Sequence, residues 1–430
     1  MAMKNKLKKL ARKFVARLLS GPIDRYEVTL QALAESNFRT RALVKLAEGQ
    51  PIHVVFACHL PALWSTFESV YKAVVEDPNF TATVIALPVR SGTPREGQYQ
   101  DGGIYDYLKG KGINVIQGYD RIKNQWTSPA SLAPDYLFFQ TPYHLFPRLW
   151  SIETVSLIAR VCYLPYASAL ATGEVEKTAH PKEFFKYVSL AFMECPLQKQ
   201  LFDGQFSEDN WYRKERTLVS GYPKFDYLTE AHEFHGSAWK RGMSKDIKRI
   251  LWTPRWRTSE GTCHFFDYKN YFVQLCGTQN IDFVFRPHPL CLQNFIKTGE
   301  MSPEQQKQMQ SDYERSSNMS IDLSGSYEDT FMTSDLLISD FSSMMIEYFA
   351  TGKPIVYTHR KNIFNEFGRR LAEGVYWVRN IKELNETVRM LVSGKDPLRQ
   401  KRHEIMKELI YLPEGGAARN IKEIIATDYR

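Results

Sequence analysis

Residues 336–354 read LLISDFSSMMIEYFATGKP, which is a short apolar run, a polar turn, a helical stretch and a Gly-Lys-Pro ending. The apolar run 336–338 predicts a buried strand, and residues 342–350 predict the helix that follows it. The next apolar run, Pro354–Tyr357, predicts a second strand. A strand, a helix and a strand in this order form the unit from which parallel α/β sheets are built.

The same alternation extends in both directions from this stretch and forms two groups. The expected strands of the first group are Ile52–Phe56, Thr83–Leu87, Ile113–Ile116, Tyr136–Phe139 and Val161–Leu164, and those of the second are Arg249–Trp252, Asp282–Phe285, Leu336–Ile338, Pro354–Tyr357 and Val375–Val378. The polar stretch between the groups shows no sustained apolar period and is expected to be a linker, residues 222–246. We therefore expect an α/β protein with two Rossmann-like domains, 21–221 and 247–430, facing each other across a cleft.

The charge of the chain is concentrated at its amino terminus. Of 56 Lys and Arg, seven lie in residues 1–20, which contain no Asp or Glu, so the formal net charge of +8 falls to +1 for the rest. A nucleic-acid partner is not expected, because such proteins carry clustered basic residues on a folded face. Apolar residues at helical spacing make 1–20 an expected amphipathic helix on an anionic membrane surface; a helix packed on the body, or a frayed terminus, is the alternative.

Compartment and redox state follow from what the sequence lacks. No run of about 18 apolar residues predicts a membrane span, and the start lacks a secretory signal pattern. We expect a cytoplasmic protein that is peripheral on the inner face of the cell membrane. The six cysteines lie far apart without a C-x-x-C pair, so buried thiols are expected rather than a zinc site or disulfides.

Phosphate-binding side chains follow three expected strands of the second group. Ser342 and Ser343 stand at a helix start, where free N–H groups and hydroxyls favour an anion, and Glu347 lies about one turn further along, where it can accept from a sugar hydroxyl. The other two strand ends supply Arg255, Arg257, Arg286 and His288. Carboxyl ends of parallel strands share one edge, so these residues are expected to surround a diphosphate.

Several common nucleotide motifs are missing from the sequence. It has no G-x-x-x-x-G-K-[ST] and no G-x-G-x-x-G, and no two Asp are spaced i, i+2. We therefore expect no cofactor and a metal-independent site in which basic residues and the helix dipole neutralise the leaving group.

The motifs Thr253-Pro254-Arg255-Trp256-Arg257, Arg286-Pro287-His288-Pro289 and Ser339-Asp340-Phe341-Ser342-Ser343, with Gly352-Lys353-Pro354 and Gly221-Tyr222-Pro223-Lys224-Phe225-Asp226, resemble those of the CDP-glycerol glycerophosphotransferase family of teichoic acid and capsule polymerases. The resemblance implies a GT-B fold, with an acceptor domain followed by a nucleotide-donor domain. It also implies transfer of glycerol phosphate or another polyol phosphate from a CDP-linked donor to a glycan or lipid-linked glycan acceptor, with release of CMP. The donor-binding positions of the family map onto Arg286, His288, Ser342, Ser343 and Glu347.

The sequence departs from the family at its proposed general base. Family members carry a His-Gly in the first domain, whereas the comparable segment here reads Cys162-Tyr163-Leu164-Pro165-Tyr166. We expect His59 to serve as base, since it ends the first strand, with His144 as the next candidate. A GT-B glycosyltransferase using a nucleotide sugar and a non-catalytic membrane-associated nucleotide-binding subunit are the alternative functions.

Overall fold

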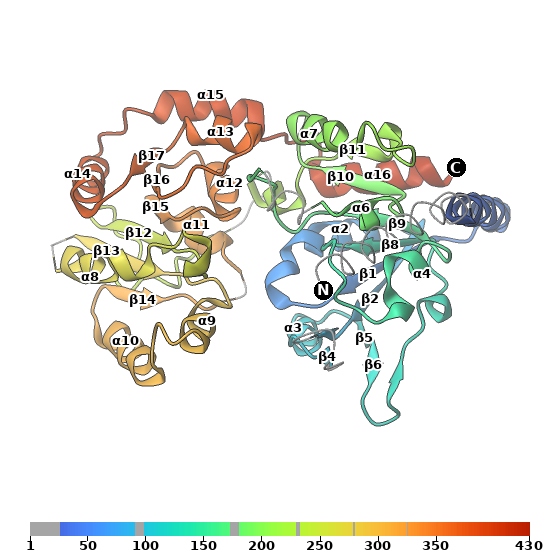
Figure 1. Cartoon of the computed structure of the whole chain (residues 1–430), viewed down its shortest axis with the longest axis horizontal. Helices are drawn as coiled ribbons and strands as arrows, with labels where there is room; N and C mark the ends of the chain where they lie inside the picture. Colours follow the sequence, from blue (N-terminus) through green and yellow to red (C-terminus); the bar gives the residue numbers. More distant parts are fainter. Residues whose placement is uncertain (1–25, 91–98, 173–179, 229–232, 278–279, 325) are drawn as a thin grey trace, which may run out of the picture.

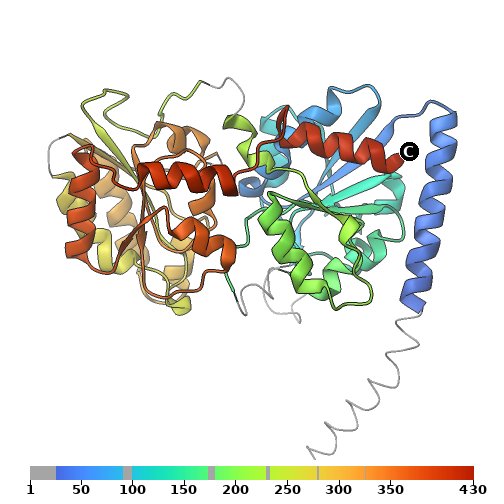
Figure 2. The same ribbon diagram turned by 90° about the horizontal axis from the view of Figure 1, so that it is seen from above.

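The computed structural model describes residues 26–90, 99–172, 180–228, 233–277, 280–324 and 326–430. Its two β-sheets lie side by side along the longest axis of the molecule (Figure 1). A helix over 26–47 runs along the outer side of the first sheet (Figure 2), where Phe38 packs against Tyr136. The expected amphipathic helix 1–20 lies outside the described residues.

The first sheet has seven parallel strands in the order β11-β10-β9-β8-β1-β2-β5. The strands are β1 (Ile52–Cys58), β2 (Phe80–Ala86), β5 (Val115–Gln117), β8 (Tyr136–Phe139), β9 (Arg160–Tyr163), β10 (Leu190–Met193) and β11 (Thr217–Val219). Its helices are α2 (Ser65–Val75), α3 (Ile104–Gly110), α4 (Ile152–Val155), α6 (Lys182–Phe185) and α7 (Pro196–Phe206). Two small hairpins join β3 (Val89–Arg90) to β4 (Tyr99–Gln100) and β6 (Tyr119–Asp120) to β7 (Gln125–Trp126).

The second sheet has six parallel strands in the order β14-β13-β12-β15-β16-β17. They are β12 (Lys248–Thr253), β13 (Ile281–Phe285), β14 (Met319–Ile321), β15 (Leu336–Ser339), β16 (Ile355–Thr358) and β17 (Tyr376–Val378). The helices around this sheet are α8 (Phe265–Cys276), α9 (Cys291–Lys297), α10 (Pro303–Arg315), α11 (Glu328–Thr333), α12 (Met344–Phe349), α13 (Glu366–Ala372), α14 (Ile381–Val392) and α15 (Arg399–Leu409).

Helices cover both faces of each large sheet, which explains why the central strands are mostly apolar, although β13 also contains the buried Asp282. In β8, β13 and β15 every residue is buried, as expected for strands covered on both sides. All six cysteines are buried and none forms a disulfide. The expected α/β class with two Rossmann-like sheets is confirmed.

The chain crosses between the two sheets twice. Residues after β11 form the 3₁₀ helix η5 (Pro223–Leu228) and lead to β12, and α16 (Gly416–Tyr429) returns to the first sheet (Figure 2). There Ile421 and Ile425 are buried in the core of β1 and α2. The carboxylate of Asp226 accepts hydrogen bonds from the N–H groups of Ala417 (2.7 Å) and Ala418 (3.1 Å), which fixes the first turn of α16. This finding differs from the expectation that 247–430 form one unit, because the apolar face of α16 is covered by the first sheet.

The carboxyl ends of the two sheets also meet directly. The N–H of Asn365 donates to the carbonyl of Leu170 (2.8 Å), and Ala171 pairs with Phe364 in an isolated antiparallel bridge. Loops from both sheets therefore lie next to each other at the edge where ligands of α/β proteins bind.

Candidate functional site

Three loops meet at the carboxyl edge of the second sheet, after β12, β13 and β15. The neighbouring strands β12 and β15 are joined there by a hydrogen bond from Thr253 Oγ1 to Ser339 Oγ (2.9 Å). The N–H of Arg286 donates to the carbonyl of Trp252 (2.9 Å), which ties the third loop to the same edge. The predicted convergence of these three segments is therefore seen, although the role of each side chain in binding stays a prediction.

Asp340 holds this edge together. Its buried carboxylate accepts from the N–H groups of Arg255 (2.8 Å) and His264 (2.9 Å) and from the hydroxyl of Thr358. Burial raises the pKa of Asp340, and these hydrogen bonds act against that rise. The carboxylate therefore fixes the loop after β12 next to the loop after β15. Its two oxygen atoms are already engaged by donors of the protein.

His288 presents a neutral imidazole at this edge. Its ring stacks on that of Trp256, with centroids 5.6 Å apart and planes inclined by 24°, and its Nδ1 accepts from the N–H of Leu290 (3.1 Å). His288 is exposed to solvent on one side, and partial desolvation by its neighbours together with the positive charge of Arg255 lowers its pKa below the ordinary value. Near pH 7 the ring is therefore uncharged and carries its proton on Nε2, which can donate to an oxygen atom.

The two arginines of the loop after β12 share one acidic partner. Arg255 Nε lies 2.7 Å from Glu260 Oε2, and Arg257 Nη1 lies 3.6 Å from Glu260 Oε1. Arg257 also stacks over the ring of Trp256, 3.9 Å from its centre. A single carboxylate leaves one net positive charge on this loop, next to His288.

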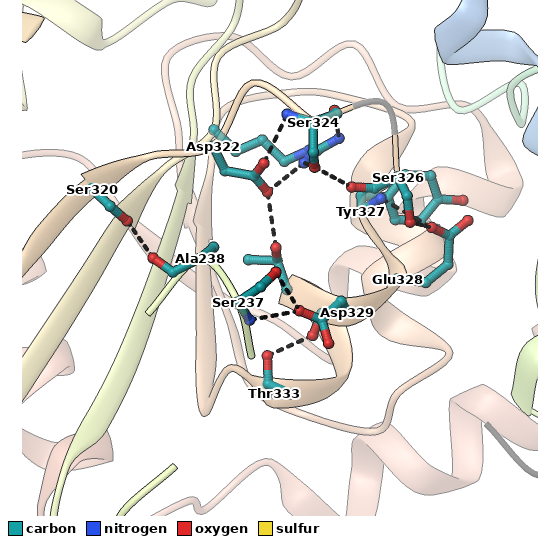
Figure 3. Close-up of polar contacts among 12 residues, drawn as sticks. Ser237, Ala238, Ser320, Asp322, Ser324, Ser326, Tyr327, Glu328, Asp329 and Thr333 are labelled. Carbon is teal, nitrogen blue, oxygen red and sulfur yellow. Dashed lines mark hydrogen bonds and ion pairs between the residues drawn. The ribbon is translucent and has the colours of Figure 1, made fainter. Parts of the chain in front are cut away.

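Arg286 is directed to the loop after β14. Its Nη1 is ion-paired with Asp322 and lies 3.2 Å from Ser324 Oγ, and its Nη2 donates to the carbonyl of Ser324 (2.8 Å). Asp322 also accepts from the N–H of Ser324 (2.9 Å) and the hydroxyl of Thr330 (2.8 Å) (Figure 3). Both terminal nitrogens of Arg286 are thus engaged in the structure, so it stabilises the 322–324 loop.

The serines at the start of α12 are half-buried. Ser342 Oγ accepts from the N–H of Met344 (3.2 Å), and Ser343 is the residue before the first helical turn, without a side-chain capping bond. Their position at the carboxyl edge agrees with the prediction, and the hydroxyl of Ser343 makes no capping contact within the described residues.

The surroundings of Glu347 differ from the expectation that its carboxylate is open to a sugar hydroxyl. It is buried in α12 and ion-paired with the buried Lys224 of η5, with Nζ and Oε1 3.1 Å apart. The ammonium of Lys224 also lies over the rings of Tyr222 (5.8 Å) and Tyr327 (5.6 Å). This partner of Glu347 was not predicted, and the place of Lys224 in the Gly221–Asp226 motif was the available signal for it.

His59 lies in the first unit, at the end of β1. It is buried, and its ring packs edge-on against Phe146 with centroids 5.7 Å apart. Desolvation lowers its pKa to about 4, so the ring is neutral near pH 7. No contact among the described residues joins His59 to the three loops of the second unit. His144 is exposed on the same edge of the first sheet.

A cavity of about 850 Å³ opens between the units. It is lined by α2 and α3 of the first unit, by η5, by α16 and by residues 326–329 of the second unit. Within the described ranges no cluster of His, Cys, Asp or Glu is arranged to hold a metal ion. No helix in the part of the chain that the structure describes is long and apolar enough to span a membrane.

Two characterised bacterial proteins are similar in sequence to part of this chain. The ribitol-phosphate polymerases TarK and TarL of Staphylococcus aureus are 28% identical over 164 residues and 30% identical over 157 residues. The matches cover 35% and 34% of this chain but only 29% and 25% of those longer proteins.

Two solved structures share the fold. The wall teichoic acid polymerase TagF matches with a TM-score of 0.58 at 16% identity, over 99% of this chain and 98% of that one. A putative UDP-N-acetylglucosamine 2-epimerase from Listeria monocytogenes matches with a TM-score of 0.56 at 12% identity, over 88% of this chain and 97% of that one. At these identities the likeness concerns the fold alone.

The sequence profile of one family matches residues 196–425, from α7 through the second sheet and into α16. This region is more than half of the chain and contains all three loops described above. The chain therefore belongs to the CDP-glycerol:poly(glycerophosphate) glycerophosphotransferase family.

Proposed function

We propose that the protein transfers a polyol phosphate from a CDP-linked donor to a hydroxyl of a cell-envelope or capsular glycan, and that CMP is released. The observation that carries this proposal is the convergence of the three loops on one edge, where the N–H of Arg255 is bonded to Asp340, ahead of α12, and the neutral His288 stacks on Trp256. A positive charge, an N–H donor and a helix start together suit a diphosphate. We further propose that the second unit binds the donor and the first unit binds the acceptor.

The reaction requires positioning and charge stabilisation more than covalent catalysis. The acceptor oxygen attacks the β-phosphorus, the bond from that phosphorus to the bridging oxygen breaks, and CMP leaves with the electron pair. His288 Nε2–H donates to a phosphate oxygen, and Arg255 stabilises the charge that develops on the leaving group. His59 takes the proton of the acceptor hydroxyl; its low pKa makes it a weak base that is unprotonated at neutral pH.

The protein is also proposed to work at the inner face of the cell membrane. Support comes from the amino-terminal sequence, where seven cations and no acids accompany apolar residues at helical spacing. Anionic lipids attract such a segment. The expected result is sedimentation of the full chain with vesicles that contain anionic lipid, weakened by salt and lost when residues 1–20 are removed. Unchanged sedimentation after that removal would reject the membrane proposal alone.

The transfer proposal is tested by nucleotide choice. The full chain is incubated with CDP-glycerol, CDP-ribitol and UDP-sugars, and release of CMP or UDP is measured with and without acceptor. We expect CMP from a CDP-polyol and at least a tenfold loss of turnover in His288→Ala, because one contact to developing charge contributes about 1.5–3 kcal/mol. UDP release from a nucleotide sugar alone would indicate the glycosyltransferase function, and nucleotide binding without turnover would indicate a non-catalytic subunit.

A further inference from the structure

The cavity between the units is built from polar groups of both. Its wall from the second unit includes Ser326 and Glu328, which follow the 322–324 loop that Arg286 holds in place (Figure 3). Its opposite wall includes Tyr107 of α3 and Ser65 at the start of α2. A volume of about 850 Å³ is within the range of ligand sites and can hold several sugar or polyol units.

The lining of this cavity carries more negative than positive charge: it has five lysines and arginines and seven carboxylates, which are Glu68, Glu76, Asp77, Asp226, Glu233, Glu328 and Asp329. Each lysine or arginine that lines it is ion-paired with a carboxylate; the pairs are Lys72 and Lys111 with Glu68, Lys224 with Glu347, Arg419 with Glu423, and Lys422 with Asp77. Glu76 and Glu233, by contrast, line it with no ion pair to a described residue. A phosphate group entering the cavity would therefore meet uncompensated negative charge.

Glu328 faces the interior of this cavity. Ser326 and the N–H of Tyr327 (3.0 Å) both donate to its Oε2, which leaves Oε1 without a donor among the described residues. Burial, with the charges of Glu68 and Glu328, raises the pKa of Tyr107, and burial with the charge of Glu328 raises the pKa of Tyr227. Tyr107 of α3 and Tyr227 of η5 line the same cavity as this carboxylate.

Two hydroxyls of the lining also lack partners. Ser65 Oγ and the Tyr227 hydroxyl are buried atoms with no hydrogen-bond partner in the described part of the chain. Buried polar atoms are normally satisfied by protein, water or ligand. Hydroxyls that can donate or accept, together with a carboxylate oxygen that only accepts, match a ligand rich in hydroxyl groups.

Two contacts tie the wall of the cavity to the elements of the proposed donor site, although Arg255, His288 and Ser342 do not line the cavity. Lys224 in its wall is paired with Glu347 of α12, and α12 begins directly after Ser342 and Ser343. The loop that carries Ser326 is held by Arg286, which follows β13 at the same edge. A chain bound in the cavity would thus lie between the donor-side edge and the first unit.

We propose that this cavity binds an uncharged, hydroxyl-rich part of the glycan acceptor next to its reacting end, and that it disfavours acceptors that carry phosphate there. The inference rests on the proposed transfer reaction and names the acceptor class for it. Glu328 accepts hydrogen bonds from acceptor hydroxyls, and its negative charge excludes phosphate-bearing repeats.

The test compares two probes on the full chain. The uncharged probe is di-N-acetylchitobiose and the anionic probe is a glycerol phosphate trimer; their binding is measured by saturation-transfer NMR, with CDP as a third ligand. Wild type is expected to bind the disaccharide more tightly than the trimer. Glu328→Gln is expected to weaken disaccharide binding about tenfold, because a hydrogen bond to a charged acceptor becomes a neutral one. CDP affinity is expected to change less than twofold.

Glu328→Lys is expected to reverse the preference in favour of the trimer. Glu314 on α10 is exposed and outside the cavity, so Glu314→Gln and Glu314→Lys are the matched controls and should change neither probe. Disaccharide binding that is absent in wild type, or within twofold of wild type in both Glu328 variants, overturns the inference. If CDP still binds and polyol phosphate is transferred to another acceptor with release of CMP, only the cavity assignment is wrong. If neither CDP binding nor CMP release occurs, the proposed transfer reaction is wrong.

Discussion

The Lys224–Glu347 ion pair gives the sharpest prediction. Both side chains are almost fully buried, with side-chain exposures of 6% and 4%, and they join η5 to α12 over 3.1 Å. Lys224→Met keeps the length of the side chain but leaves the Glu347 carboxylate buried without its cation. Removing one partner of such a pair costs about 3–5 kcal/mol, since the remaining charge has lost both water and its counterion.

An exposed pair supplies the matched control. Arg419 and Glu423 are four residues apart on α16, with side-chain exposures of 63% and 59%, and pairs of this kind contribute about 0.3–0.5 kcal/mol. Arg419→Met should therefore cost roughly a tenth of what Lys224→Met costs. The measurement is the free energy of unfolding from urea denaturation at pH 7, followed by circular dichroism and by tryptophan fluorescence.

The double variant Lys224→Met/Glu347→Met tests whether the unpaired Glu347 carboxylate causes the loss of stability in Lys224→Met. Replacing a whole buried pair by apolar residues of similar size is often neutral or stabilising, so most of the lost stability should return. A cost below about 1 kcal/mol for Lys224→Met, or no recovery in the double variant, would refute the reasoning that an uncompensated buried charge is responsible.

Three further outcomes are expected. The pKa of His59 is lowered from 6.5 to about 4, so the free energy of unfolding of the wild type should fall by up to about 3 kcal/mol as pH falls from 6.5 to 4. In urea denaturation across this pH range, His59→Asn should not show that part of the fall. Glu194 affects stability in the opposite direction: burial raises its pKa from 4.5 to about 7, so its contribution to the free energy of unfolding is lost as pH rises through 7. A Glu194→Gln variant whose stability depends on pH as that of the wild type does would contradict this. Asp340→Ala leaves the N–H groups of Arg255 and His264 without their acceptor, so the free energy of unfolding should fall by about 3 kcal/mol and CDP should bind at least tenfold more weakly. A wild-type CDP affinity of this variant, measured by calorimetry, would show that the carboxylate does not organise the site.

The central strands could be predicted from the sequence because burial on both faces makes each a continuous apolar run. The ten expected strands all correspond to strands of the structure, with ends displaced by up to three residues. Of the two large sheets, β10, β11 and β14 were not predicted, and neither were the two-residue strands β3, β4, β6 and β7. β11 and β14 are edge strands of three residues, which are too short to show a period, and β10 merges with the apolar residues that follow α6.

The loops of the candidate site could also be predicted, because parallel strands end at one edge. The partners of the charged side chains could not. Glu347 and Lys224 are 123 residues apart, and Arg286 and Asp322 are 36 residues apart, so no local pattern links them. A sequence identifies Arg286 as a cation but does not tell whether its charge faces a ligand or a neighbouring loop.

The return of α16 to the first sheet has a consequence for biosynthesis. The core around β1 and α2 includes Ile421, which a ribosome adds only after every strand of the second sheet has been made. Until then the groove that α16 fills exposes apolar surface to solvent or to a chaperone. The second unit, whose β12–β17 sheet is complete earlier, is therefore expected to become protease-resistant first during translation, although it comes later in the chain.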